Sequence, residues 1–157
     1  MVKVFLDANV VIDFLCEREG FYLPAAKLVV KGFNKEIKLF CSSLSLATAS
    51  YFMGKGNATK EEITQKISDF LTVCSVTPVD ENIVRASLSS DFSDFEDALQ
   101  YFSAKQCDIE AIITRNKKDF KTSEIPVLLP TEDLELTLEE SKRLLLEKVH
   151  QHYPPKD

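Results

Sequence analysis

Short apolar segments alternate with helical segments along this 157-residue chain, and this alternation restricts the possible folds more than any other feature. The segments that we expect to form strands are residues 2–6, 38–41, 73–79, 109–114 and 126–129. Helices are expected at about residues 9–17, 24–36, 43–54, 59–71, 80–89, 94–106 and 137–150, with a short helical turn at 116–120. Strands that alternate with helices predict an α/β fold, in which a parallel sheet carries helices on both faces.

Local signals predict several of the helix starts. Thr59 followed by Glu62, and Thr137 followed by Glu140, have the spacing of a capping box. Pro24 suits the first position of a helix, where its missing N–H group costs no hydrogen bond.

The length of the chain is typical of one domain. We expect a single domain over residues 1–157 that ends in the helix at about 137–150 and a short tail. A domain of this size buries about 70% of its unfolded surface, so its folding requires no disulfide or metal. The net charge of −6 argues against broad, non-specific nucleic-acid binding, but it allows a nucleic-acid enzyme with a local basic rim.

The cysteines and the N-terminus indicate the compartment. The four cysteines are widely spaced among apolar neighbours: Cys16, Cys41, Cys74 and Cys107. This spacing predicts buried free thiols in a reducing, cytoplasmic environment. No basic region precedes the N-terminal apolar stretch, and Asp7 and Asp13 interrupt it, so we expect neither a signal peptide nor a membrane span.

Asp7 directly follows the first expected strand. Ligands of parallel sheets bind beyond the carboxyl ends of the strands, which makes Asp7 a candidate metal ligand. Aspartate is also favoured as a helix N-cap, so a structural role is an equal alternative. Asn9 could cap the same helix and leave Asp7 free. Asp13 lies in the middle of that helix, where we expect it to be solvated or to support the site.

Asp94 and Asp97 stand three residues apart at the start of a helix and therefore share one face, whereas Glu96 is expected to point elsewhere. Acids in a first turn offset the helix dipole by about 0.3–1 kcal/mol each, which is a sufficient structural explanation. However, a largely apolar helix follows Asp97. An acid above such a face is costly unless it is paired or bound to a metal.

Polar residues also follow the most apolar strand. Thr114, Asn116 and Asp119 are found there, with Asn116 able to cap a short helix and Asp119 three residues later. Basic residues lie between and beyond them: Arg115, Lys117, Lys118 and Lys121. These cations are either a solvated rim or contacts to phosphate beside the acids.

Three motifs together resemble one family. Residues 5–13 read FLDANVVID, residues 94–98 read DFEDA, and residues 113–120 read ITRNKKDF. In this order and spacing, over about residues 2–130, they are similar to a PIN domain. Members of that family are commonly metal-dependent ribonucleases, and many bacterial members are toxins of Vap-type toxin–antitoxin pairs. The resemblance implies a three-layer α/β/α sandwich around a short parallel sheet, with a site for Mg²⁺ or Mn²⁺.

The resemblance also implies roles for individual residues. The catalytic, metal-binding acids would be Asp7, Asp97 and Asp119, with Asp94 as an additional candidate ligand. The supporting residues would be Asn9, Thr114 and Asn116. The residues expected to hold the phosphate backbone are Arg115, Lys117 and Lys118.

The chain departs from the family pattern at one position. The family usually has a glutamate in the helix after the second strand, and we place Thr48 at that position. A threonine is a poor, neutral ligand for Mg²⁺ beside a carboxylate. Asp94 or Glu96 would supply the missing charge, or else the site is weakened. No acid lies between Glu36 and Glu61, so a shifted alignment does not restore the glutamate.

The expected function is Mg²⁺- or Mn²⁺-dependent hydrolysis of phosphodiester bonds in RNA, by the toxin of a toxin–antitoxin pair. The alternative is a weakened or inactive module that binds RNA or a protein. A phosphatase or receiver-like domain is disfavoured, because the Asp7–Asn9 segment lacks a second acid. The expected partners are RNA, an antitoxin protein and a second copy of the chain.

Overall fold

The structure is a computed structural model that describes residues 1–152. Five strands alternate with seven α-helices and one 3₁₀ helix in the described part of the chain. Their order is β1 (Val2–Leu6), α1 (Ala8–Leu15), α2 (Tyr22–Phe33), β2 (Ile37–Ser42), α3 (Ser43–Lys55), α4 (Lys60–Phe70), β3 (Cys74–Thr77), α5 (Glu81–Leu88), α6 (Phe95–Gln106), β4 (Ala111–Ile113), the 3₁₀ helix η1 (Lys117–Phe120), β5 (Val127–Leu128) and α7 (Leu134–His152).

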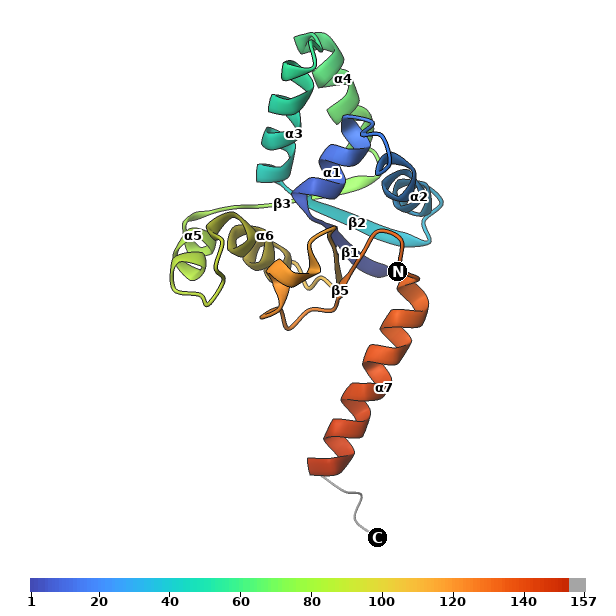
Figure 1. Ribbon diagram of the computed structural model, residues 1–157, viewed down its shortest axis with the longest axis vertical. Coiled ribbons are helices and arrows are strands. Elements are labelled where there is room, and N and C mark those ends of the chain that lie inside the picture. The colour runs from blue at the N-terminus through green and yellow to red at the C-terminus, as the bar shows by residue number, and fades with distance from the viewer. Residues whose placement is uncertain (153–157) are drawn as a thin grey trace.

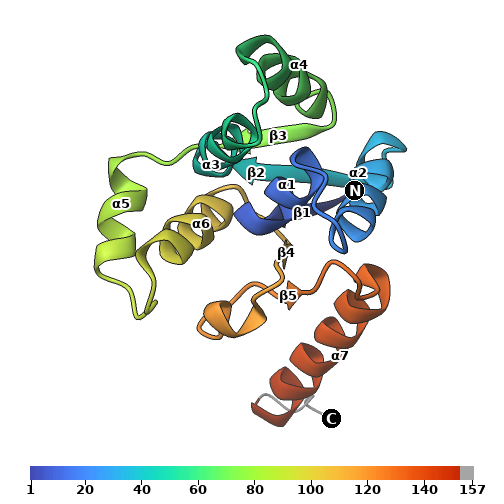
Figure 2. The same cartoon turned by 45° about the horizontal axis from the view of Figure 1, so that its top comes forward.

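The strands form one parallel sheet in the order β3-β2-β1-β4-β5 (Figure 2), which confirms the predicted α/β fold. The order reverses between β1 and β4, because the chain builds outward to β3 on one side and returns to add β4 and β5 on the other. Leu6 pairs with Ile113 across this point. The residues that follow both strands therefore lie at one edge of the sheet.

Helices cover both faces of the sheet, as Figure 1 shows. Successive residues of a strand point to opposite faces. Val4 and Leu6 accordingly pack in one buried cluster with residues of α1, α2 and α3. Phe5 packs in a second cluster with Tyr101 and Ala104 of α6. This arrangement confirms the three-layer sandwich.

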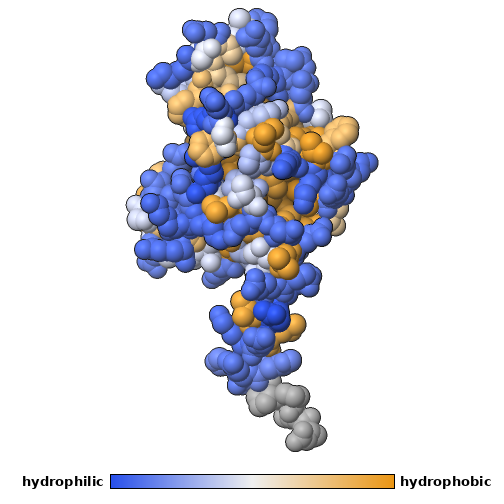
Figure 3. All heavy atoms as spheres, turned by 45° about the vertical axis from the view of Figure 1, so that its right-hand side comes forward, coloured by the Kyte–Doolittle hydropathy of each residue, from blue (hydrophilic) through white to orange (hydrophobic). Residues whose placement is uncertain are grey.

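Two elements extend beyond the layers. The helical pair α3 and α4 rises past the edge of the sheet, and α7 projects from the opposite end of the molecule (Figure 1). Leu134 and Leu138 anchor α7 in the core. Most apolar side chains further along α7 are exposed, including Leu145 and Leu146, and they are visible as apolar patches on the projecting helix (Figure 3).

The start of α7 differs from the expected one. The helix begins at Leu134 rather than at residue 137. Asp133 provides the cap, because its carboxylate accepts a hydrogen bond from the N–H group of Leu136 at 2.9 Å. The expected capping box of Thr137 and Glu140 is therefore wrong. The helix continues to His152, and the Pro154–Pro155 stop that the sequence suggests lies outside the described residues.

The second helix also has different ends. It begins two residues before Pro24, which lies in the first turn, where N–H groups have no partner within the helix. It ends at Phe33 rather than at residue 36, and Lys35 has a left-handed φ of 59°. The capping box of Thr59 and Glu62, in contrast, is confirmed on α4.

The cysteines are free thiols, as expected, although only Cys41 and Cys74 are buried, whereas Cys16 and Cys107 are half-buried.

Within residues 1–152, none of the helices has the length and apolar character needed to cross a membrane.

Candidate functional site

Asp7 stands at the point where the strand order reverses. Its N–H group donates to the carbonyl oxygen of Ile113 at 2.9 Å and so extends the β1–β4 pairing by one residue. In open α/β sheets, this point at the carboxyl ends of the strands leaves a crevice in which ligands bind. The carboxylate of Asp7 is therefore placed in that crevice by the topology of the sheet.

Three groups fix the Asp7 carboxylate. Its Oδ1 accepts from the N–H group of Ala8 at 2.8 Å, and its Oδ2 accepts from the hydroxyl of Thr114 at 2.8 Å and from the Asn9 amide at 3.1 Å. The Asn9 amide also donates to the Thr114 hydroxyl at 3.2 Å. Asp7 is thus itself the N-cap of α1, and the expectation that Asn9 would replace it there is wrong. Asn9 and Thr114 instead orient the acid.

Burial raises the pKa of the Asp7 carboxyl above its usual value, since the side chain is 4% exposed. The hydrogen bonds from Thr114 and Ala8 oppose this effect, and the nearby charges of Glu96 and Asp119 add to it. The groups that oppose the effect of burial on this pKa are hydrogen-bond donors, and the nearby charges that act on it are negative.

Asp7 faces three acids from the start of α6. A pocket of about 470 Å³ is lined by Asp7, Ala8, Asn9, Ile12, Arg18, Thr48, Phe52, Asp94, Glu96 and Asp97, and we call it the acid pocket. Asp94 caps α6 by accepting from the N–H group of Asp97 at 3.0 Å. The expectation that Glu96 points elsewhere is wrong, because Glu96 lines the pocket with its two neighbours.

Asp97 is the second acid of this group whose pKa is raised. Burial is the largest cause that raises its pKa to about 7, and the charges of Asp7, Asp94, Asp119 and Glu96 add to it, in that order. Asp119 comes from η1 and contributes to the raised pKa of both Asp7 and Asp97. The acids expected from three separate motifs are therefore brought together.

The basic residues of the 113–120 motif have other partners. Arg115 forms two bonds to Asp13, with Nε–Oδ2 at 2.7 Å and Nη2–Oδ1 at 3.2 Å, and its guanidinium lies 3.9 Å from the centre of the Phe21 ring. Lys117 pairs with Glu132 at 3.1 Å. Arg115 thus has a structural partner, and its expected contact to phosphate stays a prediction. Asp13 is buried and paired, so the expectation that it is solvated is wrong.

Three other expected residues are not part of the lining of the acid pocket: Asn116, Lys118 and Asp119. The side chain of Asn116 is exposed and makes no cap hydrogen bond to η1, so its expected capping role is wrong. Lys118 is also exposed. Conversely, sequence reasoning missed Arg18, which lines the acid pocket although it is far from the motif residues 94–98 and 113–120 in sequence.

Comparison with known proteins decides the family. The family model described as "PIN domain" matches residues 3–118, which contain Asp7, Asp94, Glu96 and Asp97, and the match ends one residue before Asp119. The chain belongs to the PIN domain family. Among curated proteins, this PIN domain is similar to Ribonuclease VapC1 of Aquifex aeolicus, with 27% identity over 135 residues that cover 83% of this chain and 92% of that protein.

Solved structures share the fold of this PIN domain at lower identity. VapBC2 from Rickettsia felis, bound to a DNA fragment from its promoter, gives a TM-score of 0.57 at 19% identity, covering 82% of this chain and 98% of that chain. FitAB bound to an IR36 DNA fragment gives a TM-score of 0.62 at 17% identity, covering 83% of this chain and 96% of that chain. Mycobacterium tuberculosis VapC20, a toxin that cleaves the sarcin–ricin loop, gives a TM-score of 0.53 at 14% identity, covering 69% of this chain and 86% of that chain.

The donor set of this PIN domain has the chemistry of a hard-cation site. Carboxylate oxygens are the ligands that Mg²⁺ and Mn²⁺ prefer. Within residues 1–152, no three His, Cys, Asp or Glu side chains converge closely enough to hold an ion as they stand. Asp7, Asp94, Glu96 and Asp97 line the pocket instead, and Asp94 and Glu96 are exposed. The raised pKa values of Asp7 and Asp97 indicate uncompensated negative charge, which fits a divalent cation.

Thr48 lies in the lining of the acid pocket, on α3. Its hydroxyl donates to the carbonyl oxygen of Leu44 at 3.0 Å and so binds its own helix. Helix α3 contains no acid, and Glu96 of α6 is among the acids that line the pocket.

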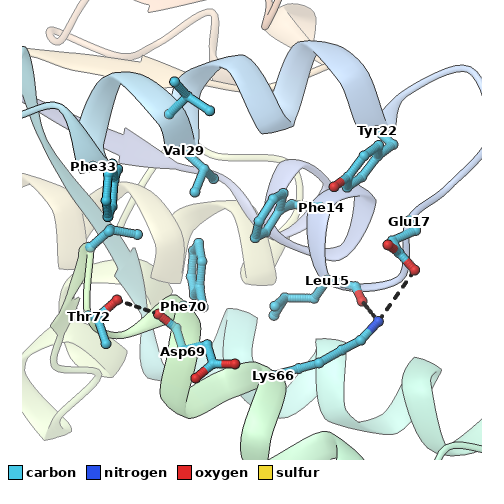
Figure 4. Close-up of a pocket in the computed structure, with 12 residues that line it drawn as sticks. Phe14, Leu15, Glu17, Tyr22, Val29, Phe33, Lys66, Asp69, Phe70 and Thr72 are labelled. Carbon is cyan, nitrogen blue, oxygen red and sulfur yellow. Dashed lines mark hydrogen bonds and ion pairs between the residues drawn. The ribbon is translucent and has the colours of Figure 1, made fainter.

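A second, mostly apolar hollow is lined by residues of α1, α2 and α4. It has a volume of about 380 Å³, and Phe14, Tyr22, Val29, Phe33 and Phe70 line it, as Figure 4 shows. Phe14 stacks on Tyr22 with ring centroids 5.8 Å apart. Phe33 remains 72% exposed, so the hollow continues into an apolar surface.

Proposed function

We propose that this PIN domain is a divalent-metal-dependent ribonuclease and the toxin of a toxin–antitoxin pair. The observation that carries the proposal is the gathering of carboxylates around one pocket at the reversal of the sheet, where burial and, after it, their charges raise the pKa of Asp97 to about 7. A pocket of this kind requires a cation, and a cation beside a phosphate is the common basis of phosphodiester hydrolysis. The names of the relatives support RNA as the substrate.

The proposed ligands of the cation are Asp7, Asp97, Asp119 and Asp94, with Glu96 in support. When bound, Mg²⁺ or Mn²⁺ would activate a water and stabilise the charge that develops on the phosphate. Thr114 and Asn9 hold one oxygen of Asp7, so that this carboxylate has a fixed orientation in the pocket.

The direct test is cleavage of a labelled single-stranded RNA with Mn²⁺ or with a chelator. Cleavage is expected with Mn²⁺ only, and Asp7→Asn and Asp97→Asn should each reduce it at least a hundredfold. Asp108→Asn is the matched control, because Asp108 is exposed, lies before β4 at the other edge of the sheet, and has a left-handed φ of 56° that asparagine tolerates. Cleavage by Asp7→Asn at the wild-type rate would contradict the proposal.

The second candidate function is an inactive module that keeps the fold and binds RNA or a protein. Thr48, in place of a glutamate, and the net charge of −6 favour it. The two candidates differ in metal binding, because an inactive module needs no ion in the acid pocket.

We also propose an antitoxin partner, which the toxin–antitoxin complexes among the related structures support. The apolar hollow beside α2 and the exposed Phe33 offer a surface that a protein partner would cover. Coexpression with the product of the adjacent gene tests this proposal: a partner should co-purify with the PIN domain and suppress RNA cleavage. Association with a second copy stays a prediction.

A further inference from the structure

Arg18 is the one cation among the residues that line the acid pocket in the described chain. It follows the end of α1, and its side chain is 35% exposed. The remaining charged members of the lining are the acids Asp7, Asp94, Glu96 and Asp97. An RNA backbone that enters this pocket is repelled by these acids, so that a cation on the opposite wall has particular weight.

Two contacts hold the Arg18 guanidinium without saturating it. Its carbon Cζ lies 5.0 Å from the centre of the Phe52 ring, and Phe52 lines the same pocket. Stacking on a ring uses the face of the guanidinium and leaves the N–H groups at its edge available. Its Nη1 lies 3.8 Å from Oδ1 of Asp13, which is longer than a hydrogen bond.

The reason that Arg18 is available is that Arg115 neutralises Asp13. Arg115 binds both carboxylate oxygens of Asp13, at 2.7 and 3.2 Å, and so satisfies the buried acid on its own. Arg18 is left with the weaker contact to the same carboxylate. Two arginines therefore share one acid unequally, and only Arg18 lines the acid pocket.

We propose that Arg18 is a substrate-binding residue whose guanidinium donates hydrogen bonds to a backbone phosphate of the RNA in the acid pocket. Asp13 and Phe52 position it. A planar guanidinium presents paired N–H groups that match two phosphate oxygens. This assignment takes the phosphate-binding role from Arg115, and it rests on the proposed ribonuclease function.

The salt dependence of RNA binding tests the contact between Arg18 and a backbone phosphate directly. Each phosphate contact to a single strand contributes about 0.7 to the slope of log K against log salt concentration. We would measure binding of a fluorescein-labelled single-stranded RNA, with Mn²⁺ present, in an Asp7→Asn background that does not cleave it. Arg18→Gln should weaken binding about tenfold or more and reduce the slope by about 0.7.

Matched variants separate this contact from general effects. Arg85→Gln removes an exposed arginine of α5 whose ion pair is with Glu81, and it should leave both affinity and slope unchanged. Phe52→Leu keeps the charge but removes the stacking, so affinity should fall severalfold while the slope is retained. If Arg18→Gln does not fold, Arg18→Met serves in its place, because the methionine side chain keeps the apolar contact with Phe52 and removes only the charge.

Kinetics in the cleaving protein give a second readout. Arg18→Gln should raise KM more than it lowers kcat, because the phosphate contact is made in the ground state as well as in the transition state. Wild-type affinity, salt slope and KM in a folded Arg18→Gln or Arg18→Met variant would overturn the assignment while RNA cleavage by the wild type stands. Failure of the wild type to bind or cleave RNA would overturn the proposed function and this inference together.

Discussion

At the scale of single residues, the site is defined by charge that its neighbours do not neutralise. Asp7 is oriented by hydrogen bonds from Ala8, Asn9 and Thr114, yet its pKa is raised because burial outweighs them. Asp97 has a pKa of about 7, chiefly because it is desolvated and secondly because Asp7 is near. Such a group binds a proton or a cation at neutral pH, and the two compete.

The pH dependence of stability should reveal Asp97. Its folded-state pKa is raised above the usual value of 3.8, so its stabilising contribution is full below about pH 4 and is lost as the pH rises to about 7. With a chelator present to remove metal ions, we expect the contribution of Asp97 to lower the thermal midpoint of the protein as the pH rises from about 4 to about 7. Asp97→Asn should flatten the change and melt above the wild type at pH 8, as differential scanning fluorimetry can measure.

Asp108→Asn is the control for this measurement, since Asp108 is exposed and lies outside the acid pocket. A wild-type dependence on pH in Asp97→Asn would show that Asp97 is not the group that titrates.

Asp13 and Arg115 form a separate, structural pair. Arg115→Gln leaves the Asp13 carboxylate, 1% exposed, with only the distant Arg18. Removing one partner of a buried ion pair lowers the free energy of unfolding by about 3 kcal/mol or more. We expect the lower value here, because the Arg115 side chain is itself partly exposed. Urea unfolding should show this loss, and the double variant Asp13→Asn/Arg115→Gln should recover part of it. A loss below about 0.5 kcal/mol in Arg115→Gln would contradict the structural role.

At the scale of elements, sequence patterns predicted the type and order of the strands and helices, because apolar periodicity and capping residues are local. Exact ends were less predictable. Asp133 caps α7 four residues before the expected cap Thr137, and both residues are favourable caps, so that packing decides between them. Leu134 is buried in the core, and this contact is gained only if the helix begins there.

Two glycines test how α2 and α3 pack. A Cβ atom on Gly32 of α2 would lie 2.6 Å from Cδ1 of the buried Leu39, whereas one on Gly54 of α3 would meet only Ile63 at 3.9 Å. Alanine gains up to about 1 kcal/mol over glycine in a helix, and overpacking costs about 1–3 kcal/mol. We therefore expect Gly32→Ala to destabilise the protein and Gly54→Ala to stabilise it in urea unfolding. Equal stabilisation by both would show that α2 does not approach β2 closely.

At the scale of the whole molecule, the sheet order brings the motifs together. The three motifs were visible in the sequence, and so were Asp7, Asp97 and Asp119. The partners of Arg115 and the position of Arg18 were not, because the Asp13–Arg115 pair and the walls of the acid pocket depend on contacts between distant segments. Glu96 was misplaced for a related reason: side chains in a first helical turn need not follow the faces of the helix interior.

The central claim is that the acid pocket holds a divalent cation although Thr48 stands where we expect the glutamate of the family. Isothermal titration of Mn²⁺ into the protein at pH 7.5 tests it without RNA. We predict saturable binding at or below millimolar Mn²⁺ in the wild type and in Asp108→Asn, weakened at least tenfold in Asp97→Asn. The account would be contradicted by a wild type that binds no Mn²⁺ at millimolar concentration, or by Asp97→Asn binding it as tightly as the wild type.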